Sequence, residues 1–278
     1  MQTRNMSNDK IDEIARELNS AREAGNMVEI LPSRQPGFDL DAAYAVELEL
    51  KHRREVNGFK AVGRKVGYAN KAVWRLLKLD TLVWAHMYDD TVHYSQNNSA
   101  TLTLPHSHSL KIEPEIVFHL KDQIREEKPD ASSALRSVDW LAIGFEIIDC
   151  PFPDWQFQPS DFVASFGLHA ALVIGEPIQV LPGNIVTLAE QLATFKVRMS
   201  KDGDFVEEGT GRNSLKNPAL CLAELSAAIA KRFPDDPLRA GEIVSSGTLT
   251  AGHPLEKEDL WTAELEGISI PPLTLKLE

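Results

Sequence analysis

Glu113 and Glu115 flank Pro114 in a segment whose apolar residues alternate in the manner of a β-strand. Because residues two apart in a strand point to the same side, the two carboxylates are expected to lie next to each other, opposite the apolar row. Carboxylates on one face repel each other unless a cation lies between them. The spacing therefore favours a cation site, whereas the ordinary alternative is a pair of glutamates on the exposed face of a sheet.

A third glutamate, Glu146, lies in the middle of the apolar segment 141–149. A carboxylate buried in such a segment is costly unless it is paired or ligates a metal ion. Three carboxylates without a cysteine thiolate suit a hard cation rather than Zn²⁺ or Cu²⁺. The cofactor predicted from these residues is Mg²⁺ or Mn²⁺.

Four histidines near these segments are weaker candidates. His106 and His108 could add ligands for a transition metal, but their polar loop favours a solvated turn. His119 shares the strand face of Glu113 and is expected either to be structural or to orient a metal ligand. His169 begins an apolar run and is expected to be a hydrogen-bonded core histidine.

The composition excludes several classes of protein. The chain has 278 residues, 43% of them hydrophobic and 25% charged, as is ordinary for a globular protein with a sizeable core. A net charge of −12 argues against a general nucleic-acid or anionic-membrane binder. No signal peptide or run of about twenty apolar residues is visible. Cys150 and Cys221 form no disulfide framework, so a cytoplasmic protein with reduced cysteines is expected.

The elements that must position these glutamates predict an α+β fold. Helices are expected over 8–24 and 41–55, in a helical N-terminal segment 1–60, and over 71–79 and 217–232. A strand over 59–68 opens the remaining region, 61–278, which we interpret as one catalytic domain with a mixed, curled sheet. Further strands are expected over 112–120, 141–149, 169–175, 194–200, 204–207, 242–246, 259–266 and 273–277.

Four motifs, taken in order, resemble the 2-keto-4-pentenoate hydratase / 4-oxalocrotonate decarboxylase family of the fumarylacetoacetate hydrolase superfamily. The resemblance covers nearly the whole chain and implies a mixed β-roll behind a helical N-terminal region. The motifs are Gly63-Arg64-Lys65-Val66-Gly67, Lys111-Ile112-Glu113-Pro114-Glu115-Ile116-Val117-Phe118, Phe145-Glu146-Ile147-Ile148-Asp149-Cys150-Pro151-Phe152-Pro153-Asp154-Trp155 and Ser246-Gly247-Thr248-Leu249-Thr250.

The resemblance also implies roles for individual residues. It makes Glu113, Glu115 and Glu146 the ligands of Mg²⁺ or Mn²⁺. Lys65 becomes the cationic group near the substrate's carboxylate and enol oxygen. The remaining implied residues are Thr248 and Gly247, as donors to the substrate carboxylate, and Asp80, as a catalytic acidic position.

The chain departs from the family pattern at several places. Arg64 stands where relatives have Tyr or Trp, and Leu82 and Ala85 stand where they have Pro and Gly. An asparagine of the family is replaced within 163–167. These departures predict an intact metal apparatus beside a changed substrate pocket. The bulky segment 80–90 is expected to be either a mobile lid or a packed surface.

The resemblance predicts a metal-dependent lyase, 2-keto-4-pentenoate hydratase-like, that acts on a small 2-oxo or 2-hydroxy-enoate acid through a metal-chelated enolate. Hydration and decarboxylation share this enolate, and Lys65 would add positive charge or a proton. The first alternative is a 4-oxalocrotonate-type decarboxylase, which the segment 246–250 favours. The others are an acylpyruvate-type C–C hydrolase, which needs a His–Glu pair, and a non-catalytic acid-binding relative. The expected partners are a small carboxylic acid and further copies of the chain.

Overall fold

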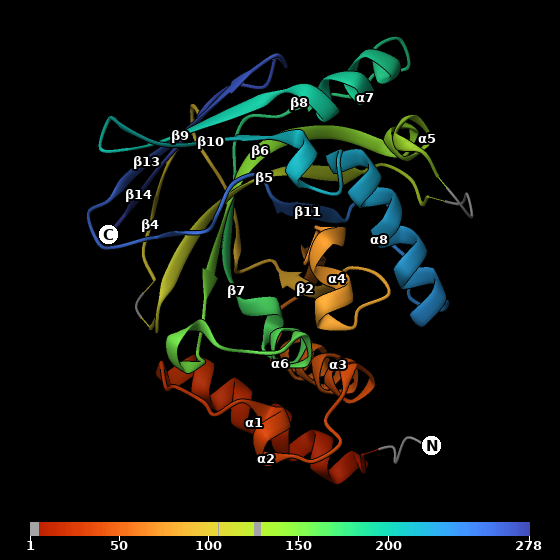
Figure 1. Ribbon diagram of the computed structural model, residues 1–278, viewed down its shortest axis with the longest axis vertical. Coiled ribbons are helices and arrows are strands. Elements are labelled where there is room, and N and C mark those ends of the chain that lie inside the picture. The colour runs from red at the N-terminus through yellow and green to blue at the C-terminus, as the bar shows by residue number, and fades with distance from the viewer. Residues whose placement is uncertain (1–5, 105, 125–128) are drawn as a thin grey trace.

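The computed structural model, which describes residues 6–104, 106–124 and 129–278, has helices at one end and two curved sheets at the other (Figure 1). The helices at that end are α1 (Asn8–Ala24), α2 (Leu31–Arg34) and α3 (Leu40–Val56). Helix α1 buries the apolar stripe that its spacing predicts and ends at Gly25, whose φ is 65°. Helix α3 is capped by Asp39, whose side chain accepts hydrogen bonds from two backbone N–H groups.

The larger sheet holds nine of the described strands, in the order β2-β1-β11-β5-β6-β7-β3, with β12 paired to β5 and β8 to β6. Strands β1 and β11 are far apart in sequence and pair in parallel. The strands are β1 (Ala61–Gly67), β2 (Val83–Tyr88), β3 (Val92–Tyr94), β5 (Leu110–Leu120), β6 (Val138–Asp149), β7 (His169–Ile174), β8 (Ile178–Gln179), β11 (Ile243–Thr248) and β12 (His253–Pro254).

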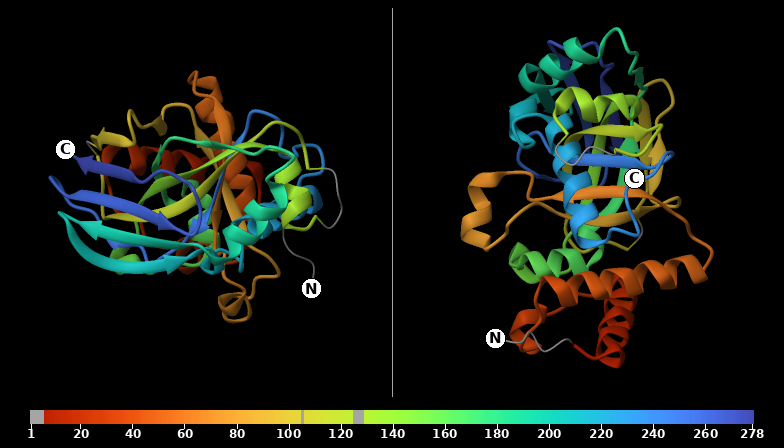
Figure 2. Two further views of the ribbon diagram at one scale, coloured as in Figure 1. Left: turned by 90° about the horizontal axis from the view of Figure 1, so that it is seen from above. Right: turned by 90° about the vertical axis from the view of Figure 1, so that its right-hand side faces the viewer.

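The second sheet has the order β10-β9-β13-β14-β4 among the described strands. A turn at 202–203 joins β9 and β10, which pair antiparallel. The strands are β4 (Ser99–Leu102), β9 (Lys196–Lys201), β10 (Asp204–Thr210), β13 (Leu260–Glu266) and β14 (Leu273–Leu277). The views in Figure 2 show both sheets curling around a shared interior. The α+β class with a curled mixed sheet is therefore confirmed.

Further helices and 3₁₀ turns connect the strands, and α8 (Pro218–Arg232) packs against β11. The remaining helices are α4 (Lys71–Leu77), α5 (Ala131–Arg136), α6 (Pro159–Ala164), α7 (Ile185–Thr194) and α8 (Pro218–Arg232), and the 3₁₀ turns are η1 (Pro153–Trp155), η2 (Phe166–Leu168) and η3 (Gly211–Asn213). Helix α8 begins as predicted, with Asn217 as its cap and Pro218 at its first position. None of the described helices is long and apolar enough to cross a membrane.

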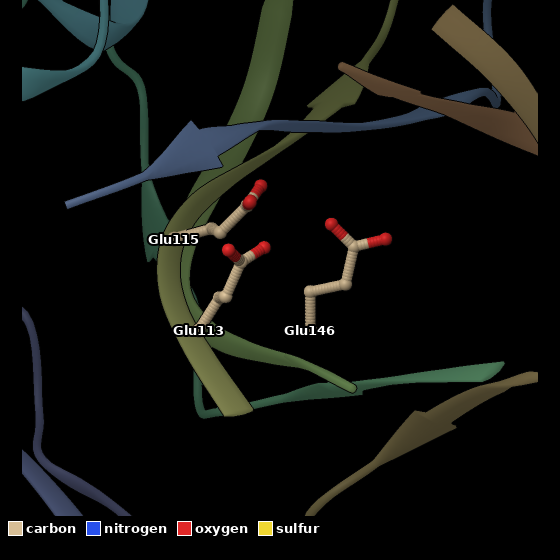
Figure 3. A group of neighbouring side chains, drawn as sticks. All are labelled: Glu113, Glu115 and Glu146. Carbon is tan, nitrogen blue, oxygen red and sulfur yellow. The ribbon is translucent and has the colours of Figure 1, made fainter. Parts of the chain in front are cut away.

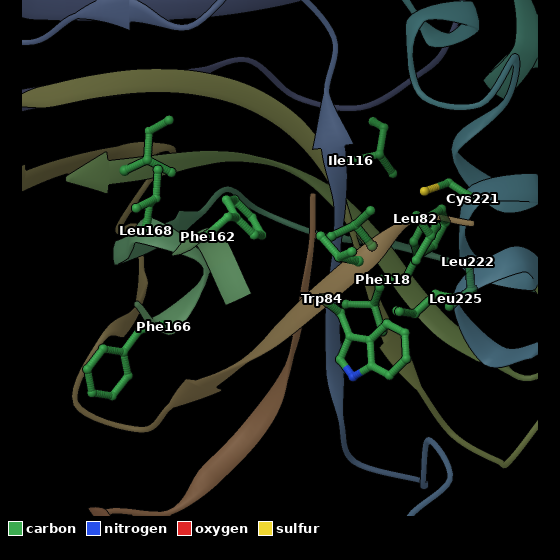
Figure 4. Close-up of a cluster of buried hydrophobic side chains, with 14 of the residues drawn as sticks. Leu82, Trp84, Ile116, Phe118, Phe162, Phe166, Leu168, Cys221, Leu222 and Leu225 are labelled. Carbon is green, nitrogen blue, oxygen red and sulfur yellow. The ribbon is translucent and has the colours of Figure 1, made fainter. Parts of the chain in front are cut away.

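The central strand β5 sends its two sets of side chains to different environments. Ile112, Ile116 and Phe118 are fully buried in the main apolar core. Figure 4 shows Ile116 and Phe118 beside Cys221 and Leu222 of α8. Glu113 and Glu115 have the opposite parity, so the alternation that the sequence predicts for this strand determines which face carries the carboxylates.

The segment 80–90 is not a lid. Its middle is strand β2, whose six residues are all buried and which pairs antiparallel with β1. Trp84 lies 4.7 Å from Tyr44 of α3, measured between ring centroids. The packed-surface alternative is therefore the correct one, because a paired, buried strand cannot open without breaking the sheet.

Arg64 does not change the pocket, contrary to the prediction. On β1 it lies on the opposite face from Lys65, with 3% of its surface exposed. Its guanidinium is 2.8 Å from the Glu242 carboxylate and 3.1 Å from that of Asp236. A buried guanidinium requires such partners, and these ion pairs attach β1 to the segment before β11.

Candidate metal and substrate site

Glu113, Glu115 and Glu146 meet at one point of the larger sheet. One carboxylate oxygen from each lies within 4.8 Å of the others. Glu113 of β5 is directly opposite Glu146 of β6 in the strand register, and Glu115 follows two residues later on the same face. Figure 3 shows the three carboxylates turned toward a common space. The cross-strand pairing thus joins the two sequence segments that were singled out separately.

Glu115 is held by strand β11. Its Oε2 accepts hydrogen bonds from Ser245 Oγ at 2.6 Å and from the Gly247 backbone N–H at 2.7 Å. The pairing of β11 with β5 shifts between Ser245 and Thr248, which turns this N–H toward the carboxylate. Gly247 has φ of 89°, a conformation that favours glycine. The Ser-x-Gly spacing is therefore a support for Glu115.

Glu146 has one occupied and one unoccupied oxygen. Its Oε1 is 3.1 Å from Lys65 Nζ and 3.1 Å from His169 Nδ1. Its Oε2 is buried and has no hydrogen-bond partner among the described residues. A buried carboxylate oxygen without a partner is costly. Because it adjoins two further carboxylates, a divalent cation with oxygen ligands fits this position.

The pKa values of the three carboxyl groups reflect their crowding. Burial, opposed by Lys65 and reinforced by Glu146, raises the pKa of Glu113 to about 7. Burial and the two neighbouring carboxylates raise the pKa of Glu115 well above its ordinary value. For Glu146, burial raises the pKa, but Lys65 and His169 together bring it below the ordinary value. A bound cation would favour the ionised form of all three.

Lys65 is buried beside the carboxylates and does not extend to solvent. It is 2% exposed, its Nζ donates to the Gly167 backbone oxygen at 2.9 Å, and it lies 4.7 Å from the centre of the Phe162 ring. A Cβ added at Gly167 would lie 2.8 Å from Lys65 Cδ. The glycine is thus required for the lysine to fit, and the ammonium is fixed in place.

A cavity of about 460 Å³ opens onto this group of charges. Lys65, Glu113 and Glu115 contribute to its polar side. Its apolar side consists of Tyr68, Ile148, Trp155, Phe157, Phe162 and Leu168. Such a cavity, with a few charges at one end of an apolar wall, suits a small organic acid.

The other predicted site residues lie in different places. Gly247 and Thr248 line this cavity. The Gly247 N–H is engaged with Glu115, and the Thr248 hydroxyl donates to the Thr250 backbone oxygen at 2.9 Å. Asp80 is exposed and is absent from the residues that line the cavity. The structure therefore brings Asp80 together with none of the other predicted residues.

The histidines also separate. His108 pairs with Asp149 at 2.7 Å and lines another cavity together with His106, so these two residues do not join the glutamates. His119 stacks on Trp140 with ring centroids 4.9 Å apart, which supports its structural interpretation. His169 is buried, as expected, but it also binds a carboxylate of the site.

Sequence reasoning missed the supporting role of three residues. Ser245, Gly167 and His169 hold Glu115, Lys65 and Glu146, respectively. Ser245 has a signal that appears only with the strand pairing, because it is the parallel partner of Lys65. The other two act through contacts between segments that are distant in sequence, for which a single sequence provides no signal.

A family model for the C-terminal part of fumarylacetoacetate (FAA) hydrolase matches residues 60–273. The chain belongs to the fumarylacetoacetate hydrolase family. The family resemblance predicted from the four motifs is therefore confirmed. The match includes every strand that carries the carboxylates and Lys65.

Sequence and structure comparisons find lyases that are similar to this chain, and a hydrolase that is similar in fold. The 2-keto-4-pentenoate hydratase of Paraburkholderia xenovorans (strain LB400) is 27% identical over 257 residues, which are 92% of this chain and 91% of the relative. The 4-oxalocrotonate decarboxylase from Pseudomonas putida G7, complexed with magnesium and adipate, has a similar fold, with a TM-score of 0.87. The two sequences are 22% identical, and the match covers 99% of this chain and all of the decarboxylase chain. The fumarylpyruvate hydrolase from Pseudomonas aeruginosa, in complex with Mn²⁺ and pyruvate, is less similar, with a TM-score of 0.56 and 16% identity. This match covers 78% of this chain and 88% of the hydrolase chain.

Proposed function

We propose that this protein is a Mg²⁺- or Mn²⁺-dependent lyase for a small 2-oxo or 2-hydroxy-enoate acid, with hydratase activity as the main assignment. The observation that carries the proposal is the junction of three carboxylates with the buried Lys65, which together with Glu113 and Glu115 lines a cavity with an apolar wall. The curated hydratase relative, aligned over most of both chains, supports the reaction class.

The three glutamates would hold the cation, which would stabilise negative charge on the carboxylate and C2 oxygen of the substrate. Glu146 Oε2 is available for this role because Lys65 and His169 both contact Oε1. Lys65 would stabilise charge on the substrate's oxygen or transfer a proton there. The apolar wall would exclude water from the reacting carbons, with Thr248 beside them.

Decarboxylation remains the second candidate because it develops negative charge at the same oxygen, and the decarboxylase of similar fold supports it. The C–C hydrolase is less well supported. That reaction needs a His–Glu pair to activate water, and the described residues that line the cavity include no histidine. The non-catalytic alternative is disfavoured by the buried Lys65, since binding alone would not require a cation fixed beside Glu146.

Three further features belong to the proposal. We propose a homo-oligomer, supported by the exposed Phe205 and Leu260 on the second sheet. A cytoplasmic location is supported by two buried cysteines that are not in a disulfide. The division into a helical segment 1–60 and a catalytic domain 61–278 is supported by the family match, which begins at residue 60. Light scattering on the purified protein tests the first of these.

Turnover assays test the main proposal. The purified protein is offered 2-hydroxypenta-2,4-dienoate, 4-oxalocrotonate or an acylpyruvate, each with Mg²⁺, Mn²⁺ or EDTA. Metal-dependent hydration of the dienoate supports the hydratase, and metal-dependent release of CO₂ from oxalocrotonate supports the decarboxylase. Cleavage of the acylpyruvate alone would replace both with the hydrolase, and no turnover in any combination would favour the non-catalytic binder.

A further inference from the structure

The turn η2, between α6 and β7, has a strained backbone. Phe166, Gly167 and Leu168 follow one another with φ angles of 54°, 61° and 57°. Glycine adopts this left-handed conformation readily, whereas residues with a Cβ atom are strained in it. Two of the three residues are large and apolar, so contacts from outside the turn must hold it in this shape.

This turn makes two of the contacts that arrange the metal site. The Gly167 backbone oxygen accepts the hydrogen bond from Lys65 Nζ at 2.9 Å. The next residue but one, His169, has its Nδ1 3.1 Å from Glu146 Oε1, the same oxygen that lies 3.1 Å from Lys65 Nζ. Leu168 lines the cavity at the carboxylates, here called the metal-site cavity. The shape of the turn therefore determines where the ammonium and the imidazole meet Glu146.

Arg22, on helix α1, contacts both ends of this turn. Its Nη1 donates to the His169 backbone oxygen at 2.5 Å, and its guanidinium carbon lies 4.6 Å from the centre of the Phe166 ring. A planar guanidinium can make both contacts at once. Burial, together with the nearby Arg54, lowers the pKa of Arg22 to about 10, so the group stays charged at neutral pH. Its hydrogen bond to the turn is therefore charge-assisted.

The turn separates Arg22 from the metal site. Phe166 lines a cavity of about 330 Å³ together with Arg22, whereas Leu168 lines the metal-site cavity. Figure 4 shows the side chains of Phe166 and Leu168 pointing away from each other. Because only three residues of backbone lie between the two cavities, a contact made by Arg22 on one side fixes the Gly167 oxygen on the other.

We propose that Arg22 is a positioning residue for Lys65: by holding both ends of the turn, it keeps the Gly167 oxygen in place beside the ammonium. This inference rests on the proposed function, because it assumes that the reaction uses Lys65. It also gives the N-terminal helical segment a part in the site, since α1 supplies the guanidinium. The rival explanation is that Tyr88 of β2, whose ring centroid lies 6.5 Å from that of Phe166, holds the turn alone.

Chemical acetylation of Lys65 tests the proposal without requiring turnover. Arg22→Met retains most of the apolar stem but has no N–H donor. In Mg²⁺, Lys65 should react with sulfosuccinimidyl acetate about tenfold faster in this variant than in the wild type, the effect of losing one charge-assisted hydrogen bond. Peptide mass spectrometry measures the rate. Arg16→Met, on the same helix, removes a guanidinium that pairs with Asp12 at 2.9 Å, and as the matched control should react like the wild type.

Hydrogen exchange at residues 116–120 of β5 distinguishes local release of the turn from general loosening of the fold. Exchange there should be the same in Arg22→Met and the wild type. Arg22→Lys keeps a donor without the planar group and should accelerate acetylation by a smaller factor. If Arg22→Met does not fold, the same criteria apply to Arg22→Lys.

Three results would overturn the inference. The first is a wild-type acetylation rate in the Arg22 variant, which would favour Tyr88 as the sole support. The second is an equal acceleration in Arg16→Met. The third is an acceleration accompanied by faster exchange in β5, because Arg22 would then stabilise the whole fold and not the turn.

Kinetics of a double variant tests the link between Arg22 and the reaction. Arg22→Met should lower kcat about tenfold in an otherwise wild-type chain. In a Lys65→Met chain it should have little further effect, because no ammonium remains to be positioned. Equal losses in both chains would overturn the assigned role.

The proposed function is judged separately by the turnover assays. If the wild type turns over none of the acids, the function falls and the acetylation rates alone decide the role of Arg22. If the wild type is active while Arg22→Met leaves acetylation unchanged, the function stands and the role of Arg22 falls.

Discussion

His169 and Glu146 face each other across neighbouring strands, with Nδ1 of the imidazole 3.1 Å from Oε1 of the carboxylate. The other ring nitrogen, Nε2, is 3.0 Å from Thr91 Oγ1. Because an ionised carboxylate oxygen can only accept, the contact with Glu146 requires that Nδ1 carries a proton and donates it to this oxygen. The histidine would thereby orient the carboxylate so that Oε2 faces the other two glutamates.

His169→Ala should weaken Mg²⁺ binding by about 10- to 100-fold, the usual cost of losing a residue that orients a metal ligand. His169→Asn retains a donor near the Nδ1 position and should lose less. Titration calorimetry with Mg²⁺ measures both, and circular dichroism checks the fold. Equal affinity in the wild type and the alanine variant would show that Lys65 alone orients Glu146.

Glu115→Ala should severely weaken Mn²⁺ binding, because it removes a ligand that Ser245 and Gly247 hold in place. Calorimetric titration of Mn²⁺ measures the effect. Glu264→Gln, an exposed carboxylate on β13, is the matched control and should bind Mn²⁺ normally. Metal should also raise the melting temperature of the wild type by mass action. Wild-type affinity in Glu115→Ala would remove this residue from the site.

Lys65→Met should lower kcat/KM by about two to four orders of magnitude on whichever acid is turned over. Methionine retains most of the apolar stem but not the charge that contacts Glu146. Lys276→Met on β14, far from the cavity, controls for loss of one lysine and should retain normal kinetics. The measurement is steady-state kinetics at saturating metal. Turnover equal to that of the wild type would assign Lys65 a purely structural role.

The metal-free protein should become less stable as the pH rises from about 4.5 to about 7. The folded-state pKa of Glu113 is about 7, above its ordinary value of 4.5, so in this window the folded protein retains a proton that the unfolded chain has released. The protonated Glu113 therefore stabilises the folded state at low pH. This contribution to stability is lost as the pH rises to about 7 and does not change further above it. Mg²⁺ should then raise the melting temperature more at pH 8 than at pH 6.

Thermal denaturation in EDTA and in Mg²⁺ across this range measures both trends. Glu113→Gln has no titratable group at this position and should flatten the metal-free profile. A melting temperature of the wild type that rises with pH in EDTA would contradict a raised pKa of Glu113.

Strand β2 should be strongly protected from hydrogen exchange in the ligand-free protein. Its backbone is paired with β1 and its side chains are buried, so exchange requires large-scale opening. Oxalate with Mg²⁺ should leave the protection of residues 83–88 almost unchanged. Fast exchange that slows on addition of oxalate would restore the lid hypothesis.

The sequence predicted what depends on local periodicity. The alternation in 112–120 located both the core face and the carboxylate face of β5, and the helices predicted over 8–24 and 217–232 are α1 and α8. It could not predict the environment of Arg64, since the partners Asp236 and Glu242 come from a distant segment. The sequence also could not decide whether the bulky residues in 83–88 form a lid or a packed surface, because the burial of β2 depends on its pairing with β1.

The candidate site follows the same division. Glu113, Glu115 and Lys65 were identifiable from spacing and family motifs, and the strand register brings them together with Glu146. The contacts of His169 and Gly167 arise only when β7 and the turn before it pack against β6 and β1. Asp80 matched a family motif in sequence, yet it is exposed in the segment between α4 and β2 and does not line the metal-site cavity.

The opposite directions of Arg64 and Lys65 on β1 have a consequence for folding. A shift of this strand by one residue would exchange the two cations between the faces of the sheet. The guanidinium would then enter the crowded space beside Glu146, and the ammonium would face Asp236 and Glu242 with the wrong geometry. The arginine and the lysine therefore favour the correct pairing of β1 with β11. A chain in which this strand is shifted by one residue would lose favourable ion pairs on both faces of the sheet.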